Sequence, residues 1–148
     1  MHRSSSTVSR PVTGRGPVSG AAVAVAVVFL ALGVLGFIPD VTSRYDDLGL
    51  AGQHSGARLF GVFEVSVLHN LVHLVSGVAG LALARTATGA RTFLIGGGAV
   101  YLVLWVYGLA IEQDSAANFL PVNDADNWLH LGLGIAMIGL GVLASRRR

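Results

Sequence analysis

Residues 65–84 read VSVLHNLVHLVSGVAGLALA, twenty residues without a charged side chain. Three further segments have a similar length and character: Val18–Ile38, Thr92–Ile111 and Trp128–Ala144. A helix needs about 17–25 predominantly apolar residues to cross the hydrocarbon core of a bilayer. Only helices and closed barrels satisfy their backbone polar groups in lipid, and we find no segment that alternates with period two. The sequence therefore predicts an all-α fold, a four-helix transmembrane bundle.

The composition agrees with a membrane protein. Of 148 residues, 53% are hydrophobic and only 12% are charged, whereas soluble domains average about 25% charged residues. The absence of cysteine excludes disulfides, thiolate metal sites and cysteine nucleophiles. All ten basic residues are arginine, which together with abundant Ala, Gly and Val is typical of a GC-rich bacterial genome. They are dispersed among segments that flank the apolar runs, so we expect no nucleic-acid partner.

The charges divide the chain into two sides. Eight arginines and no acidic residue fall in residues 1–19, 85–91 and 145–148, whereas all eight acidic residues fall in the two other connections, with Arg44 and Arg58. By the positive-inside rule both termini lie in the cytoplasm, so the topology is N-in/C-in in the cytoplasmic membrane. We expect a disordered cytoplasmic tail over residues 1–19, a four-span membrane domain over 20–144 and a basic cytoplasmic end over 145–148.

One polar pattern occurs twice inside the apolar segments. Asn70-Leu-Val-His73 recurs as Asn127-Trp-Leu-His130, 57 residues later (70 to 127). Polar side chains are costly in lipid, so such positions are where a site is expected. Residues 20–38 contain no polar side chain and lack the aromatic pattern of residues 92–111. We therefore interpret the echo as a repeated helix rather than a duplicated hairpin, and predict that the first helix is peripheral.

Helical spacing of three and four places the polar residues of each segment on one face. In the second segment this face includes Ser66, and in the fourth, for which Asp124 is the predicted N-cap, it includes Asp126. Both helices run from outside to inside, so we expect a polar site between helices 2 and 4 in the outer half of the membrane. Its candidate residues are His69, Asn70, His73, Asn127 and His130.

Three interpretations of this site remain open. Asn and His can hydrogen-bond between helices, at about 0.6 kcal/mol per contact. Alternatively, His73 and His130 could be the axial ligands of a b-type haem, because each is followed four residues later by a glycine that leaves room for a flat ring. A metal or proton site could use His69, His73 and His130, with Asp126 completing the shell.

No catalytic or phosphate-binding motif is found in the sequence. We therefore expect a protein that is not an enzyme and has no cofactor, with haem or metal as the alternative. The expected partners are the lipid bilayer, a second copy of the chain or another membrane protein.

Several short stretches carry a family resemblance: FGVFEVSVLHNLVH at 60–73, YL at 101–102, YG at 107–108, NFLPVN at 118–123 and DNWLHL at 126–131. With them the chain resembles a bacterial membrane-protein family, domain of unknown function 4383, from about Val18 to Val142. The resemblance implies a small four-span protein, found mostly in high-GC Gram-positive bacteria. It implies no activity, cofactor or catalytic residue.

Overall fold

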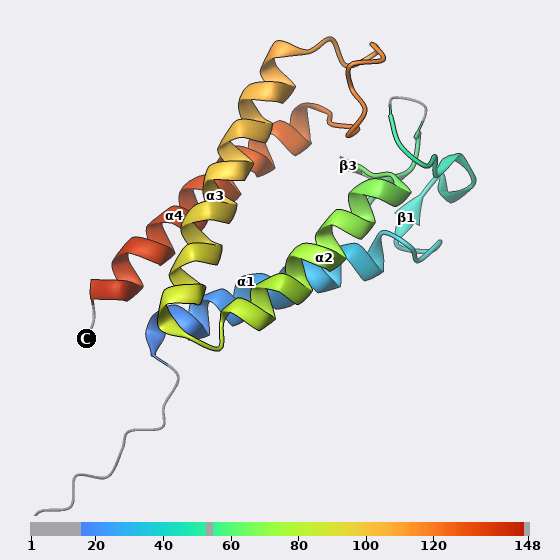
Figure 1. Ribbon diagram of the computed structural model, residues 1–148. Coiled ribbons are helices and arrows are strands. Elements are labelled where there is room, and N and C mark those ends of the chain that lie inside the picture. Colours follow the sequence, from blue (N-terminus) through green and yellow to red (C-terminus); the bar gives the residue numbers. More distant parts are fainter. Residues whose placement is uncertain (1–15, 53–54, 147–148) are drawn as a thin grey trace, which may run out of the picture.

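The computed structural model describes residues 16–52 and 55–146, and within them the chain forms four α-helices (Figure 1). The connection between the first two helices also contains a 3-10 turn, η1, and three short strands. The elements in chain order are α1 (Pro17–Leu35), β1 (Thr42–Ser43), η1 (Tyr45–Asp47), β2 (Arg58–Leu59), β3 (Phe63–Glu64), α2 (Val67–Leu83), α3 (Ala87–Ala110) and α4 (Asp124–Arg146).

Three helices within the described residues are long and apolar enough to cross a membrane: α1, α3 and α4 from Asp124 to Ala144. Helix α2 is also apolar but has 17 residues. Its length is about 25 Å at 1.5 Å per residue, slightly less than the ~30 Å of a typical hydrocarbon core. The predicted helical fold is therefore confirmed, with three helices that could span a membrane, and α2 is shorter than the predicted segment 65–84.

The helices pack as two hairpins, α1 against α2 and α3 against α4, and glycines make the closest contacts. A Cβ added at Gly77 of α2 would lie 2.5 Å from Leu30 Cγ and 2.9 Å from the Ala26 carbonyl oxygen. At Gly134 of α4 it would lie 2.6 Å from Leu102 Cδ2. In lipid, small residues allow this backbone approach, which replaces apolar burial as the source of helix association.

The two hairpins are copies of one arrangement, so the interpretation of the echo as a repeated helix alone is wrong. Buried residues of α1 and α3 correspond at a spacing of 72 (29 to 101), and those of α2 and α4 at 57 (70 to 127). A comparison of the sequence with itself at one spacing does not detect this repeat. The two spacings differ by 15 residues (72 and 57), because the connection after α1 is longer than the connection after α3. The corresponding buried pairs are Val18/Ala90, Ala22/Leu94, Ala26/Gly98, Phe29/Tyr101, Gly36/Gly108, Asn70/Asn127, Gly77/Gly134, Gly80/Met137 and Ala84/Gly141.

Helix α1 is central rather than peripheral. It contacts α2, α3 and α4, and its Phe29 is fully buried. The Phe29 ring lies 5.5 Å from the ring of Tyr101, its counterpart in the other hairpin, and 5.7 Å from the ring of His73. The prediction failed because it took an absence of polar side chains as a sign of lipid exposure, whereas a core also requires apolar residues.

The connection after α1 folds into a small antiparallel sheet with the order β1-β2-β3. Leu59 pairs with Thr42 on one side and with Phe63 on the other. Phe60 and Gly61 have positive φ values of 53° and 73° and form the turn between β2 and β3. Strands of two residues are too short to show a period-two pattern, so the sequence analysis missed this sheet.

Side-chain caps define the start of both α2 and α4. The Ser66 hydroxyl accepts a hydrogen bond from the His69 amide, so Ser66 is the N-cap of α2 and not part of its polar face. Asn123 accepts from the Asp126 amide, and the Asp126 carboxylate accepts from the Asn123 amide in return. This is a capping box. Asn123, and not the predicted Asp124, is therefore the N-cap of α4.

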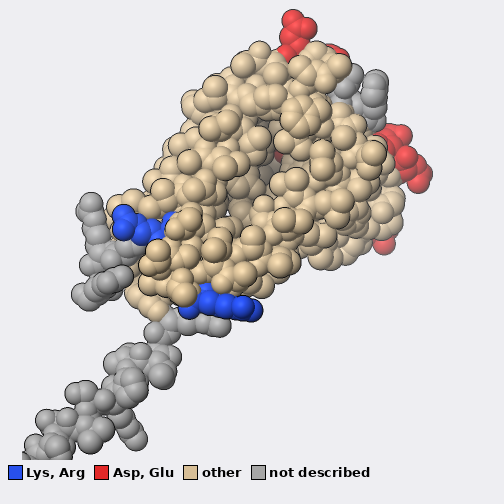
Figure 2. All heavy atoms as spheres, viewed as in Figure 1, with Lys and Arg blue, Asp and Glu red and all other residues tan. Residues whose placement is uncertain are grey.

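We call the end of the bundle with connections 36–66 and 111–123 the loop end, and the end with the α2–α3 connection the turn end. On the face drawn in Figure 2, the arginines lie at the turn end and the protruding acidic side chains at the loop end, with uncharged surface between them. The predictions for most of the N-terminal tail and for Arg147 and Arg148 lie outside the described residues.

Candidate functional site

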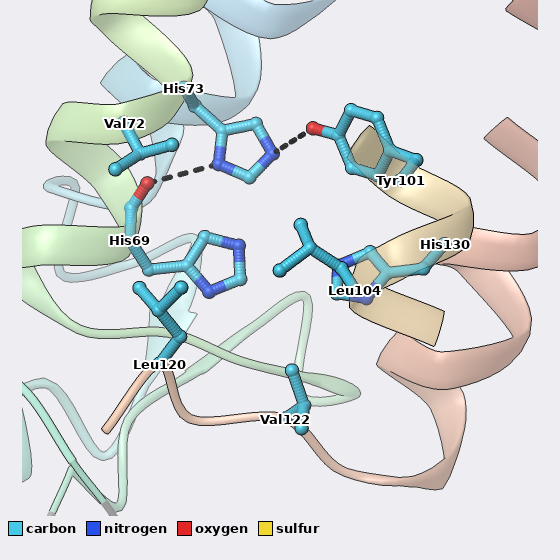
Figure 3. A pocket seen from close by; sticks show the side chains of 8 residues that line it. All are labelled: His69, Val72, His73, Tyr101, Leu104, Leu120, Val122 and His130. Carbon is cyan, nitrogen blue, oxygen red and sulfur yellow. Dashed lines mark hydrogen bonds between the residues drawn. The ribbon is translucent and has the colours of Figure 1, made fainter. Parts of the chain in front are cut away.

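The predicted histidines meet at one cavity near the loop end, between the two hairpins (Figure 3). It has a volume of about 40 Å³, enough for one or two water molecules. Helix α2 contributes two histidines and helix α4 one, while α3 and the 111–123 connection complete the wall. The lining residues are His69, Val72, His73, Tyr101, Leu104, Leu120, Val122 and His130.

His73 is held by hydrogen bonds on both sides of its ring (Figure 3). Its Nδ1 lies 3.1 Å from the His69 carbonyl oxygen; because a carbonyl can only accept, Nδ1 carries the proton. Nε2 of the neutral ring is then an acceptor, and the Tyr101 hydroxyl donates to it over 3.4 Å. One bond is local to α2 and the other crosses to α3, so His73 links the two hairpins.

His69 and His130 keep unsatisfied polar atoms at the same place. Their rings enter the cavity from α2 and from α4 (Figure 3), and the Nδ1 atom of each is buried without a hydrogen-bond partner. The His130 ring contacts Tyr101 at 5.4 Å between centroids. Buried polar groups are normally paired, so these two rings are the members of the cluster whose hydrogen bonding is incomplete.

The two asparagines make equivalent contacts, one in each hairpin. A Cβ added at Gly36 would lie 2.1 Å from Asn70 Oδ1, and one added at Gly108 would lie 1.8 Å from Asn127 Oδ1. Each amide therefore packs against a glycine near the end of the preceding helix of its own hairpin. Asn70 also lines a second cavity of about 20 Å³. Asn70 therefore borders the second cavity together with the histidines, whereas Asn127 lines neither of these two cavities.

Asp126 lines the second cavity but is already engaged by backbone groups. Its carboxylate accepts from the amides of Glu64 and Asn123, at 3.0 and 3.1 Å. It thereby ties strand β3 to the start of α4. The second cavity also includes the three histidines and Tyr101 in its wall, so the cluster lies between the two cavities.

The metal alternative does not fit this geometry. The rings of His69 and His73 stack at 4.7 Å with 9° between their planes, whereas two imidazoles that share an ion direct their in-plane lone pairs at one point. Both ring nitrogens of His73 have hydrogen-bond partners. Among the described residues no group of three or more His, Cys, Asp or Glu is arranged to hold a metal ion.

The haem alternative does not fit either. It depended on free space beside Gly77 and Gly134, but these positions face α1 and α3 so closely that even a methyl group would collide. A cavity of about 40 Å³ is also small beside the roughly 300–1,000 Å³ of ordinary cofactor pockets. Nothing in the described residues supports a haem site.

The sequence analysis missed four residues that shape this region: Phe29, Tyr101, Leu120 and Val122. The sequence signal for Tyr101 is that it corresponds to Phe29 at the spacing of 72. Leu120 and Val122 belong to a connection whose folding back over the helices has no periodic signature. A comparison of the sequence with itself at the spacings of 57 and 72 could have found the pair Phe29 and Tyr101. It could not have shown that the 111–123 connection folds over the helices.

Together these features define a helical protein of membrane type, built from two similar hairpins with a histidine cluster between them. The chain belongs to the family described as Domain of unknown function (DUF4383), which matches residues 20–143. The resemblance noted from the sequence is thereby confirmed at the level of the family. No curated protein and no solved structure matches the chain.

Proposed function

We propose that this chain is a four-span protein of the cytoplasmic membrane of a bacterium, with both termini in the cytoplasm. It is not an enzyme, and its His and Asn side chains hold the helices of the bundle in place. Its partners are the lipid bilayer and, through the exposed apolar helix faces, a second copy or another membrane protein.

The separation of charge between the two ends of the bundle carries this proposal. Arg85 lies on the connection between α2 and α3 and Arg91 lies near the start of α3, whereas the acidic residues lie on the loop-end connections and at the start of α4. A cytoplasmic turn end and an external loop end satisfy the positive-inside rule. With this topology α2 must span as well, because its two ends lie at opposite ends of the bundle (Figure 1). A short span is accommodated by slight thinning of the bilayer.

The side-chain contacts support a structural role for the polar residues. Tyr101 bonds to His73 between the hairpins, and each asparagine packs on a glycine within its hairpin. These groups lie where helices cross, and the bond between Tyr101 and His73 is one that lipid cannot offer. Such contacts contribute about 0.6 kcal/mol each in helical membrane proteins, so several together fix the geometry rather than supply most of the stability.

Reporter fusions test the topology. Alkaline phosphatase, active only outside the cytoplasm, should be inactive when fused after Arg148 or after Thr86 and active when fused after Asp114. A green fluorescent protein fused at the same positions should give the opposite pattern. Phosphatase activity after Arg148, or fluorescence after Asp114, would show that the topology is wrong.

A further inference from the structure

The cavity beside the histidine cluster opens sideways. Leu120 and Val122 close it at the loop end, while Val72 and Leu104 form its sides on α2 and α3 (Figure 3). The surface of the bundle is hollowed between α2 and α3 at this place (Figure 2). In the proposed topology this side of the bundle faces lipid. A molecule dissolved in the bilayer can therefore reach the histidines without passing through water.

The wall of the cavity is chemically divided. Val72, Leu104, Leu120 and Val122 are apolar, whereas the inner end presents the rings of histidine and the Tyr101 hydroxyl. A mostly apolar wall with a few convergent polar groups is the usual character of a small-molecule site. Beside this inner end, Nδ1 of both His69 and His130 is buried without a hydrogen-bond partner, so neither ring is fully engaged within the protein.

The charge of the lining restricts the occupant. The eight residues around this cavity include no Lys, Arg, Asp or Glu. A phosphate or carboxylate head group would be buried there without a counter-charge, which is strongly unfavourable. An uncharged oxygen, by contrast, can accept from or donate to a neutral imidazole. The volume of about 40 Å³ admits such a group but not a ring system, so the remainder of the molecule must lie outside.

We propose that this cavity binds the uncharged oxygen head group of a long-chain membrane amphiphile, whose apolar chain lies in the hollow between α2 and α3. Hydroxyl and quinone carbonyl oxygens share this chemistry, and an isoprenoid alcohol and an isoprenoid quinone are its two sources in a membrane. The proposal goes beyond the structural role above and depends on it only for the membrane orientation.

Binding of two tritium-labelled probes, farnesol and a short-chain menaquinone, to the full chain in nanodiscs tests this proposal. Val72 is 45% exposed and borders the cavity, whereas Val75 is 67% exposed on the same helix and lies outside it. Val72→Phe narrows the opening, and Val75→Phe is the matched control. Both side chains are exposed, so neither change should prevent folding.

We expect saturable binding of one or both probes at one molecule per chain. Val72→Phe and His130→Leu should each weaken it by about tenfold, and Val75→Phe should leave it unchanged. Binding of farnesol alone identifies the alcohol as the source, and binding of menaquinone alone the quinone. The proposal is overturned if neither probe saturates, or if Val72→Phe binds as tightly as Val75→Phe. Neither result would alter the reporter-fusion pattern, so the two proposals fail independently.

Discussion

Replacing Gly98 by alanine should push α3 and α4 apart. The new Cβ would lie 2.8 Å from the Gly134 carbonyl oxygen and 2.8 Å from Ile138 Cγ1. Close carbon–oxygen contacts are ordinarily about 3.3–3.6 Å, so the helices must separate by roughly 0.5–0.8 Å. The oxygen belongs to the backbone and cannot rotate away. Overpacking of this kind costs about 1–3 kcal/mol.

Gly96 on the same helix provides a matched control. A Cβ there would meet nothing within 4 Å. Any gain in intrinsic helix propensity, about 1 kcal/mol for Gly→Ala, is shared by the two variants. The difference between them therefore isolates the contact with α4.

Thermal unfolding in detergent, followed by circular dichroism, measures this difference. For a chain of this size 1 kcal/mol corresponds to roughly 2–4 °C, so Gly98→Ala should melt about 2–12 °C below Gly96→Ala. Gly77→Ala should lower the melting temperature by a similar amount, because its Cβ would lie 2.9 Å from the Ala26 carbonyl oxygen of α1, within the α1–α2 hairpin. Equal melting temperatures for Gly96→Ala and Gly98→Ala would refute the packing described here.

Three further predictions concern the caps, the pH dependence and the cofactor alternatives. Asn123→Ala removes the N-cap of α4 and should cost about 1 kcal/mol, measured by the same unfolding assay. Burial raises the pKa of Glu64 above its ordinary 4.5, although the positive charge of Arg58 opposes this shift. The folded state then binds the proton more tightly than the unfolded state, so the free energy of unfolding should fall as the pH rises above 4.5. The melting temperature of Glu64→Gln should not show this fall. The purified protein should show no Soret band and no stoichiometric metal; a stoichiometric Soret band that disappears in both His73→Ala and His130→Ala would establish a haem protein instead.

Sequence reasoning recovered the features that depend on local composition and periodicity. Apolar length predicted the helices, and polar residues in apolar segments predicted His69, His73 and His130, which do meet at one cavity. It failed where the outcome depends on which helices become neighbours. Tyr101 reaches the cluster only because α3 packs between the two histidine-bearing helices. The same limit applies to Asn70. Helical spacing predicts the helix face on which Asn70 lies, but it does not predict that the side chain packs against Gly36.

The repeat separates structural requirements from chemistry. Positions that both hairpins need for folding carry equivalent residues: the caps Ser66 and Asn123, and the asparagines that pack on glycine. Positions that differ in chemistry between the copies are therefore not fixed by the shared packing. Two such pairs lie at the histidine cluster. His69 of the first copy corresponds to Asp126 of the second at the spacing of 57 (69 to 126), and Phe29 corresponds to Tyr101. Their polar members, His69, Asp126 and Tyr101, line the two cavities. These differences in side-chain chemistry between the two copies therefore lie at the walls of the two cavities.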